Sequence, residues 1–222
     1  MIFRVLALAI GYAFGVFQTG FLYGKAHGVD IRKCGSGNTG ATNTLRTFGW
    51  RGGLITFVGD CMKTILAIVV ATLLLKDHFY DDLLVLQMYA GFGSVLGHNF
   101  PFYLGFKGGK GIACTIGVAL AVCPATVPVC LTIFFLCFAL SQYVSLGSIL
   151  MSLVFIIQVW VYNGYGIFGL TGADATEFNI LAFILGAMAI IRHKDNLVRL
   201  FKGTENKISK KSEIQTDKKE EE

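Results

Sequence analysis

Long apolar runs, most of them long enough to cross a lipid bilayer, occupy the greater part of this 222-residue chain. A membrane-spanning helix needs about 20 mainly apolar residues, and in lipid its backbone polar groups must be satisfied within the helix itself. The hydrophobic fraction is 54%, the charged fraction is 15%, and the mean hydropathy is +0.63. Because a soluble domain carries about 25% charged residues, the chain is predicted to be an all-α integral membrane protein.

Seven transmembrane helices are expected. Five apolar runs each fit one span, at 3–24, 53–75, 83–104, 143–163 and 178–191. A further run, 112–140, is too long for one simple span and is interrupted by Pro124 and Pro128. Since proline breaks or kinks a helix, this run is predicted to form two short helices, 112–123 and 125–140.

The distribution of charge favours seven spans over six. Segments 25–51, 105–111 and 192–222 are basic, whereas the segments near 76–82 and 164–177 hold one Lys and five acids, namely Asp77, Asp81, Asp82, Asp174 and Glu177. Basic loops face the cytoplasm under the positive-inside rule. Seven spans place every basic segment on that side, which predicts an N-terminus outside and a cytoplasmic C-terminus.

One membrane domain, 1–207, is expected, followed by a charged cytoplasmic tail, 208–222. The tail has almost no apolar residue and is expected to be disordered. The six cysteines form no C-x-x-C pair, and five lie in apolar segments. Neither a disulfide framework nor a metal site is therefore expected.

The first of three polar segments, 35–46, has the sequence GSGNTGATNTLR. Its glycines expose backbone N–H groups, its hydroxyls and amides add neutral donors, and its arginine adds a bidentate cation. Such donors suit an anion, and those singled out are Ser36, Gly37, Asn38, Thr42, Asn43 and Arg46. The alternative is a flexible loop, because glycine and asparagine favour turns.

The second polar segment, 106–111, has the sequence FKGGKG and leads directly into an apolar run. Free N–H groups and the positive end of the dipole at a helix start favour phosphate, so Lys107, Gly108, Gly109 and Lys110 are candidate ligands. The segment is not a Walker A loop, because Gly111 follows Lys110 and no strand precedes it. A basic turn that merely obeys the positive-inside rule is the alternative.

The third polar segment, 191–205, contains His193 and Asn196, which share a face if the segment is helical. The alternative is a basic helix end held by anionic lipid headgroups. Taken together, the three segments place anion-binding groups on one side of the membrane with little acid nearby, which indicates an anionic, interfacial substrate. Asp60 and Lys63, three residues apart in the second span, are either a structural ion pair or part of the site.

These motifs resemble those of the bacterial PlsY family of acyl-phosphate:glycerol-3-phosphate acyltransferases. The resemblance covers about residues 3–207 in the expected order, through the GSGNxGATNxLR, FKGGKG and RHxxNxxRLxxGxE motifs, the Asp60–Lys63 pair and the YVSLxS stretch from Tyr143. The sequence departs from the family pattern at Thr39, Thr64, Cys114 and Gln142. Gln142 stands where arginine is expected, which removes one cation near the site.

The resemblance implies that the sn-1 hydroxyl of glycerol 3-phosphate attacks the carbonyl of an acyl phosphate, giving lysophosphatidate and inorganic phosphate. It implies no cofactor, no metal and no nucleic-acid partner, and functional coupling to the enzyme that makes acyl phosphate. The implied location is the bacterial cytoplasmic membrane, with a cytoplasmic active site. The implied catalytic residues are Ser36, Arg46, Lys110, His193 and Asn196, with Ser145 as a further contact to glycerol phosphate.

The acceptor of the hydroxyl proton stays open between His193 and the phosphate of the substrate. The H-x4-D signature of other membrane acyltransferases is absent from the sequence. A transporter and a lipid-binding scaffold are the alternative functions. A transporter for phosphate or glycerol 3-phosphate would place its site at broken helices near the midplane, and a lipid-binding scaffold would tolerate Lys110→Arg, since only charge would matter.

Overall fold

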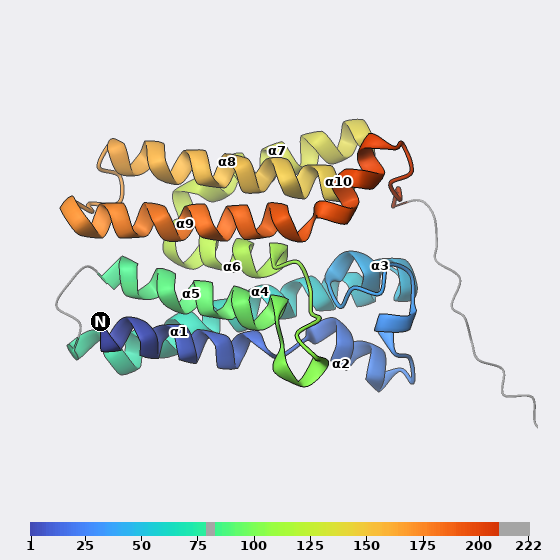
Figure 1. Cartoon of the computed structure of the whole chain (residues 1–222), viewed down its shortest axis with the longest axis horizontal. Coiled ribbons are helices and arrows are strands. Elements are labelled where there is room, and N and C mark those ends of the chain that lie inside the picture. Colours follow the sequence, from blue (N-terminus) through green and yellow to red (C-terminus); the bar gives the residue numbers. More distant parts are fainter. Residues whose placement is uncertain (79–82, 209–222) are drawn as a thin grey trace, which may run out of the picture.

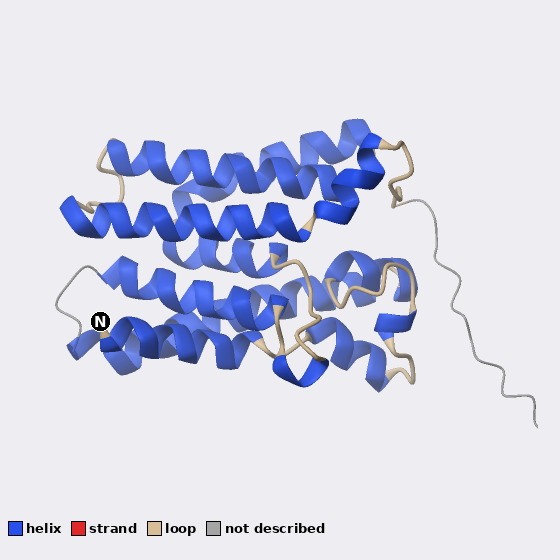
Figure 2. Ribbon diagram, viewed as in Figure 1, coloured by secondary structure: helices blue, strands red, loops and turns tan. Residues whose placement is uncertain are grey.

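The structure is a computed structural model that describes residues 1–78 and 83–208. In these residues it consists of helices and connecting loops, without strands (Figures 1 and 2). The predicted all-α class is therefore confirmed for the part of the chain that is described. The acids expected at Asp81 and Asp82, and nearly all of the predicted tail, lie outside the described residues.

The longer helices form the body of the molecule, and shorter ones join them. The helices are α1 (Ile2–Gly15), α2 (Thr19–Ala26), α3 (Ala41–Phe48), α4 (Trp50–Leu75), α5 (Leu83–Asn99), α6 (Ile112–Val122), α7 (Val127–Ser141), α8 (Val144–Gly164), α9 (Gly172–Arg192) and α10 (Lys194–Phe201). Single 3-10 turns lie at Ile31–Lys33, Lys76–His78, Phe102–Leu104 and Pro124–Thr126.

Five helical stretches within the described residues are long and apolar enough to cross a membrane: Ile2–Ala26, Trp50–His78, Pro124–Ser141, Val144–Gly164 and Gly172–Arg192. Helix α5 has 17 residues and α6 has 11. At 1.5 Å per residue, α6 is only about 16 Å long against a hydrocarbon core of about 30 Å. The chain is thus a multi-pass membrane protein, and the count of seven spans stays a prediction.

Several predicted boundaries are wrong for local reasons. The first span is interrupted between Gly15 and Thr19. Helix α5 ends at Asn99 rather than 104, because Pro101 cannot continue it. Helix α9 begins at Gly172, so Asp174 and Glu177 lie on a helix rather than in a loop. The predicted break at Pro124 is confirmed.

Helices α1 and α5 pack backbone against backbone through glycine. A Cβ atom on Gly11 would collide with the carbonyl of Ala90, and one on Gly93 would collide with the carbonyl of Leu8. Small residues of this kind allow close approach of helices in lipid. Helix α1 therefore packs closely against α5.

The outer surface of the bundle is apolar. Large exposed hydrophobic side chains include Leu54, Leu66 and Leu73 on α4, Phe135 and Leu140 on α7, Trp160 on α8, and Phe183 on α9. The three polar segments gather at one end of the bundle with α3 and α10, while the N-terminus lies at the other end (Figure 1). An apolar belt with polar groups at its ends is the surface that a bilayer requires.

Candidate active site

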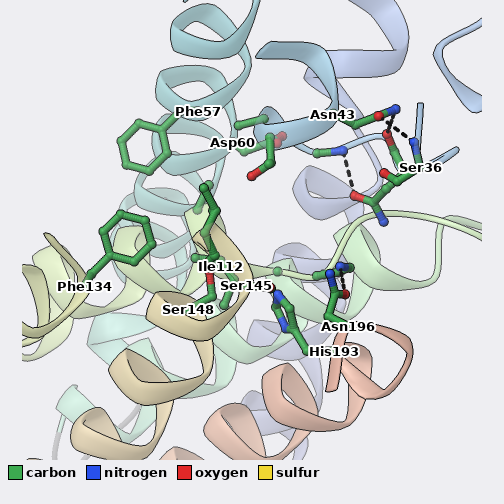
Figure 3. Close-up of a pocket in the computed structure, with 18 of the residues that line it drawn as sticks. Ser36, Asn43, Phe57, Asp60, Ile112, Phe134, Ser145, Ser148, His193 and Asn196 are labelled. Atoms are coloured by element: carbon green, nitrogen blue, oxygen red, sulfur yellow. Dashed lines mark hydrogen bonds between the residues drawn. The ribbon is translucent and has the colours of Figure 1, made fainter. Parts of the chain in front are cut away.

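A pocket lies where the three polar segments meet, and it has two chemically different ends (Figure 3). Its polar end is lined by Ser36, Asn38, Thr42, Asn43, Arg46, Lys110, Ser145, His193, Asn196, Arg199 and Glu205. Its apolar end is lined by Phe57, Ile112, Ile116, Leu131, Phe134 and Phe135, from α4, α6 and α7. Such a pocket suits a ligand with an anionic head and a hydrocarbon chain.

The cations of the pocket are partly desolvated. Lys110 Nζ donates to Asn196 Oδ1. Burial lowers the pKa of Lys110 to about 8, against the opposing charge of Glu205. Burial likewise lowers the pKa of Arg46, which donates through Nη2 to the carbonyl of Asn206 at 2.9 Å. Its buried Nε has no partner among the described residues, so this donor is available to a phosphate oxygen.

Glu205 is a pocket residue that the sequence analysis did not select. Its Oε1 accepts from Ser145 Oγ at 3.0 Å and Asn196 Nδ2 at 2.7 Å, and its Oε2 accepts from Arg199 Nε at 2.8 Å. Burial alone would raise the pKa of Glu205, but these hydrogen bonds hold it below its usual range. The expectation of little acid near the site is therefore wrong, because Glu205 and Asp60 both line the pocket.

His193 joins α9 to α10, so its ring is placed by two helices at once. Nδ1 lies 2.7 Å from the carbonyl oxygen of Ala189, which assigns the proton of the neutral ring to Nδ1 and leaves Nε2 as an acceptor. Burial, followed by the charge of Lys110, lowers the pKa of His193 to about 4. His193 is therefore neutral at pH 7.

Several expected ligands turn out to hold the polar segments together. The side-chain amide of Asn43 donates to Ile31, Cys34 and Asn38 carbonyls, and its oxygen accepts from the Ser36 N–H. The Asn43 amide is thus engaged within its own loop, and its contact with substrate stays a prediction.

The glycine-lysine loop is likewise internally bonded. The Gly108 and Gly109 N–H groups donate to Asn99 and His98 carbonyls at 3.2 and 3.0 Å, so they do not offer free donors to phosphate. Arg192 donates to the carbonyls of both glycines, and Asn38 Nδ2 donates to that of Gly108. These contacts brace all three polar segments against one another.

Four predicted site residues lie outside the pocket lining: Gly37, Lys107, Gly108 and Gly109. Lys107 is exposed, whereas Lys110, three residues later, reaches into the pocket. Gly111 ends the loop with φ of 83°, a left-handed conformation that glycine adopts without strain. The turn at Gly111 leads directly into α6.

Asp60 and Lys63 form a buried ion pair beside the pocket. Lys63 Nζ donates to Asp60 Oδ1 at 2.8 Å, to His98 Nδ1 at 2.9 Å, and to the carbonyl of Phe17 in the break between α1 and α2. All three ammonium donors are therefore used. Asp60 and His98 also line the pocket, so the pair is both structural and adjacent to the site.

No group of three or more His, Cys, Asp or Glu side chains in the described ranges is placed to hold a metal ion. The six cysteines are free, and none lines the pocket.

Fold and site together define a multi-pass helical membrane protein with a cationic pocket that continues into an apolar groove. Comparison with known proteins shows that the chain belongs to the glycerol-3-phosphate acyltransferase family, whose model matches residues 5–203.

Relatives match over nearly the whole chain. The glycerol-3-phosphate acyltransferase of Clostridioides difficile (strain 630) is 39% identical over 94% of this chain and 97% of its own length. That of Alkaliphilus metalliredigens (strain QYMF) is 38% identical over 95% and 99%. A crystal structure of PlsY (YgiH), an integral membrane glycerol 3-phosphate acyltransferase in its glycerol 3-phosphate form, superposes with a TM-score of 0.79 at 31% identity, covering 92% of this chain and 94% of that one.

Proposed function

We propose that this chain transfers an acyl group from acyl phosphate to the sn-1 hydroxyl of glycerol 3-phosphate. The hydroxyl oxygen forms the new ester bond to the carbonyl carbon, and the bond from that carbon to the phosphate oxygen breaks. The electron pair leaves with inorganic phosphate, which also receives the hydroxyl proton, and lysophosphatidate is the other product. The main support is that one pocket holds Arg46 and Lys110 at its polar end and reaches Phe135 at its apolar end.

The donor is assigned by what the pocket supplies. An acyl phosphate is a mixed anhydride with a good leaving group, so positioning and charge stabilisation suffice for its reaction. Two phosphorylated reactants repel each other, and Arg46, Lys110 and Arg199 offset that repulsion. Family membership supports glycerol 3-phosphate as the acceptor, and a PlsY crystal structure in a lysophosphatidic acid form matches this chain with a TM-score of 0.77.

Roles for the side chains follow from their contacts. Arg46 and Lys110 bind phosphate oxygens, Ser36, Ser145 and Asn196 orient the reactants with neutral groups, and α4, α6 and α7 hold the acyl chain. His193 offers Nε2 as a proton acceptor, but its lowered pKa makes it a weak base. A phosphate oxygen of the donor is the second acceptor, and either route delivers the proton to the departing phosphate.

The reaction is proposed to take place at the cytoplasmic face of the bacterial inner membrane, in a chain with seven spans and an outside N-terminus. The support is the positive-inside distribution of Lys and Arg, together with the gathering of the three polar segments at the end opposite the N-terminus (Figure 1). Functional coupling to the enzyme that makes acyl phosphate follows from this choice of donor.

Purified protein in lipid, supplied with glycerol 3-phosphate and palmitoyl phosphate, tests the proposal. Phosphate and lysophosphatidate should appear in equal amounts, with no product from palmitoyl-CoA. Lys110→Ala and His193→Ala are measured in parallel, and Lys110→Ala should abolish most of the activity. Product from palmitoyl-CoA alone would refute the donor assignment, and no lysophosphatidate from either donor would refute the activity.

A further inference from the structure

Asp60 lines the pocket and carries an unused hydrogen-bond acceptor. The side chain is 1% exposed, and Oδ2 has no partner among the residues that the structure describes. Its other oxygen, Oδ1, accepts from both Lys63 Nζ at 2.8 Å and Thr19 Oγ1 at 3.0 Å. A buried carboxylate oxygen without a partner is unfavourable. Because Oδ1 is bonded and Oδ2 is not, we expect a bound molecule in the pocket to donate a hydrogen bond to Oδ2.

The surrounding network supplies no such donor. Lys63 uses its three N–H groups on Asp60 Oδ1, His98 Nδ1 and the Phe17 carbonyl. His98 receives a hydrogen bond at Nδ1, and its Nε2 faces Gly109, where a Cβ atom would collide with it. The network therefore fixes the orientation of the Asp60 carboxylate and leaves Oδ2 without a partner from the described residues, on a side chain that lines the pocket.

Asp60 lies between the two ends of the pocket. In Figure 3 it stands between Phe57 of the apolar end and Ser36 of the polar end, with Ile112 nearby. The carbonyl carbon of an acyl phosphate joins its phosphate to its hydrocarbon chain. When the phosphate is held at the polar end and the chain in the apolar end, that carbon must lie at the border between them.

The chemistry of the two reactants indicates which of their groups can donate a hydrogen bond to Asp60. An ionised acyl phosphate offers only acceptors, and the phosphate of glycerol 3-phosphate is repelled by a carboxylate. The hydroxyl groups of glycerol 3-phosphate are the donors available. We propose, on the basis of the function proposed above, that Asp60 Oδ2 accepts the hydrogen bond of the sn-1 hydroxyl before reaction and orients its oxygen toward the carbonyl carbon. As the new ester bond forms, the hydroxyl proton passes to the departing phosphate.

The test compares Asp60→Asn with the matched control Thr19→Val. In Asp60→Asn the amide oxygen pairs with Lys63, and the NH2 group replaces the acceptor that faces the pocket. Thr19→Val removes a hydrogen bond from the same carboxylate but leaves Oδ2 in place. Asp60→Asn should lower kcat by about 10- to 100-fold with the KM for palmitoyl phosphate unchanged. Thr19→Val should stay within about threefold of wild type.

A second acceptor identifies the hydroxyl. Propane-1,3-diol monophosphate keeps the reacting hydroxyl and lacks the sn-2 hydroxyl, so Asp60→Asn should lose the same factor with it as with glycerol 3-phosphate. A loss that vanishes with this analogue would place Asp60 on the sn-2 hydroxyl and overturn the assignment. Equal losses in Asp60→Asn and Thr19→Val, or a loss confined to the KM of the donor, would also overturn it.

Folding is checked by the melting temperature of each variant, because Asp60→Asn leaves a buried ammonium with a weaker partner. If that variant does not fold, the double variant Asp60→Asn, Lys63→Gln removes both charges, and the same kinetic split is expected. Unchanged kcat in a folded Asp60 variant refutes this inference alone. Absence of lysophosphatidate with the wild-type chain refutes the proposed function instead.

Discussion

At the scale of single residues, the site is a set of buried polar groups whose partners can be named atom by atom. Arg46 Nε and Asp60 Oδ2 are two buried polar atoms at the pocket without hydrogen-bond partners in the described part of the chain, one a donor and one an acceptor. Phosphate and hydroxyl groups match them respectively. Glu205, by contrast, is fully engaged with Ser145, Asn196 and Arg199.

Lys110 and Lys107 should respond differently to substitution. Lys110→Ala is expected to lower kcat/KM by about 100-fold, because a desolvated cation next to the reacting phosphates is removed. Lys110→Arg should not restore full activity, since the guanidinium cannot occupy the site of a compact ammonium bonded to Asn196. Lys107→Ala, in the same loop but exposed, should change kcat/KM by less than about threefold. Steady-state kinetics decide, and equal losses at the two lysines would contradict the geometry.

The pH profile should show a loss of activity on the alkaline side. Lys110 has a pKa of about 8, so it is cationic below that pH and loses its charge as the pH rises through it. The kcat/KM for glycerol 3-phosphate, which reports the free enzyme, should therefore fall above pH 8. The His193 pKa of about 4 predicts no titration of this residue between pH 5 and 7. If Lys110→Arg retains the same alkaline loss, the assignment to Lys110 fails.

At the scale of elements, the sequence predicted the helices well and their ends less well. Hydrophobic runs located each long helix, and Pro124 correctly separated α6 from α7. The break between α1 and α2 was not predictable from an apolar run, because it is stabilised by contacts with distant residues. Gln18 donates to the His98 carbonyl, and Lys63 donates to the Phe17 carbonyl. The role of Glu205 was missed for the same reason, since its partners lie on α8 and α10.

Replacing a glycine at the contact of α1 with α5 should reduce thermal stability more than replacing a glycine at a helix end. Gly11→Ala is expected to lower the melting temperature by roughly 3 to 12 °C, which corresponds to about 1–3 kcal/mol of overpacking. Gly164→Ala is the control, because no atom lies within 4 Å of the added Cβ. Thermal unfolding in detergent measures both. A Gly11→Ala variant as stable as Gly164→Ala would mean that the two helices separate easily.

Activity should require the segment after α10 through Glu205, but no residue beyond 208. A chain ending at 203 loses the carboxylate that pairs with Arg199 and the Asn206 carbonyl that binds Arg46. Its kcat/KM should fall by at least about 10-fold. A chain ending at 208 should retain activity within about twofold. Loss of activity in the longer truncation product would contradict this boundary.

At the scale of the whole molecule, the strongest agreement between sequence and structure is the meeting of the three polar segments. They are separated by apolar runs in the sequence, yet Asn38 and Arg192 both bind the carbonyl of Gly108. The charge pattern predicted that they lie on one side of the membrane. It could not distinguish residues that bind substrate from residues that hold the loops together. That distinction depends on which N–H groups the fold already uses, as it does those of Asn43, Gly108 and Gly109.

Membrane topology can be tested from two exposed positions at opposite ends of the bundle. In a variant without native cysteines, Tyr165→Cys and Lys202→Cys should differ in labelling of intact cells by an impermeant maleimide. Only the cysteine at 165 should react in intact cells, and the one at 202 should react after lysis, because the positive-inside rule predicts that the basic end is cytoplasmic. Labelling of both in intact cells would contradict seven spans with an outside N-terminus.

The apolar end of the pocket reaches Phe135, whose side chain is 59% exposed on the outer face of α7. Under the proposed function, glycerol 3-phosphate arrives through water, whereas the acyl donor enters laterally from the bilayer. For the second, the relevant concentration is its mole fraction among the surrounding lipids. Adding inert lipid at constant total amounts would slow the reaction by surface dilution. The enzyme would thus respond to the composition of its own membrane, even with its water-soluble substrate in excess.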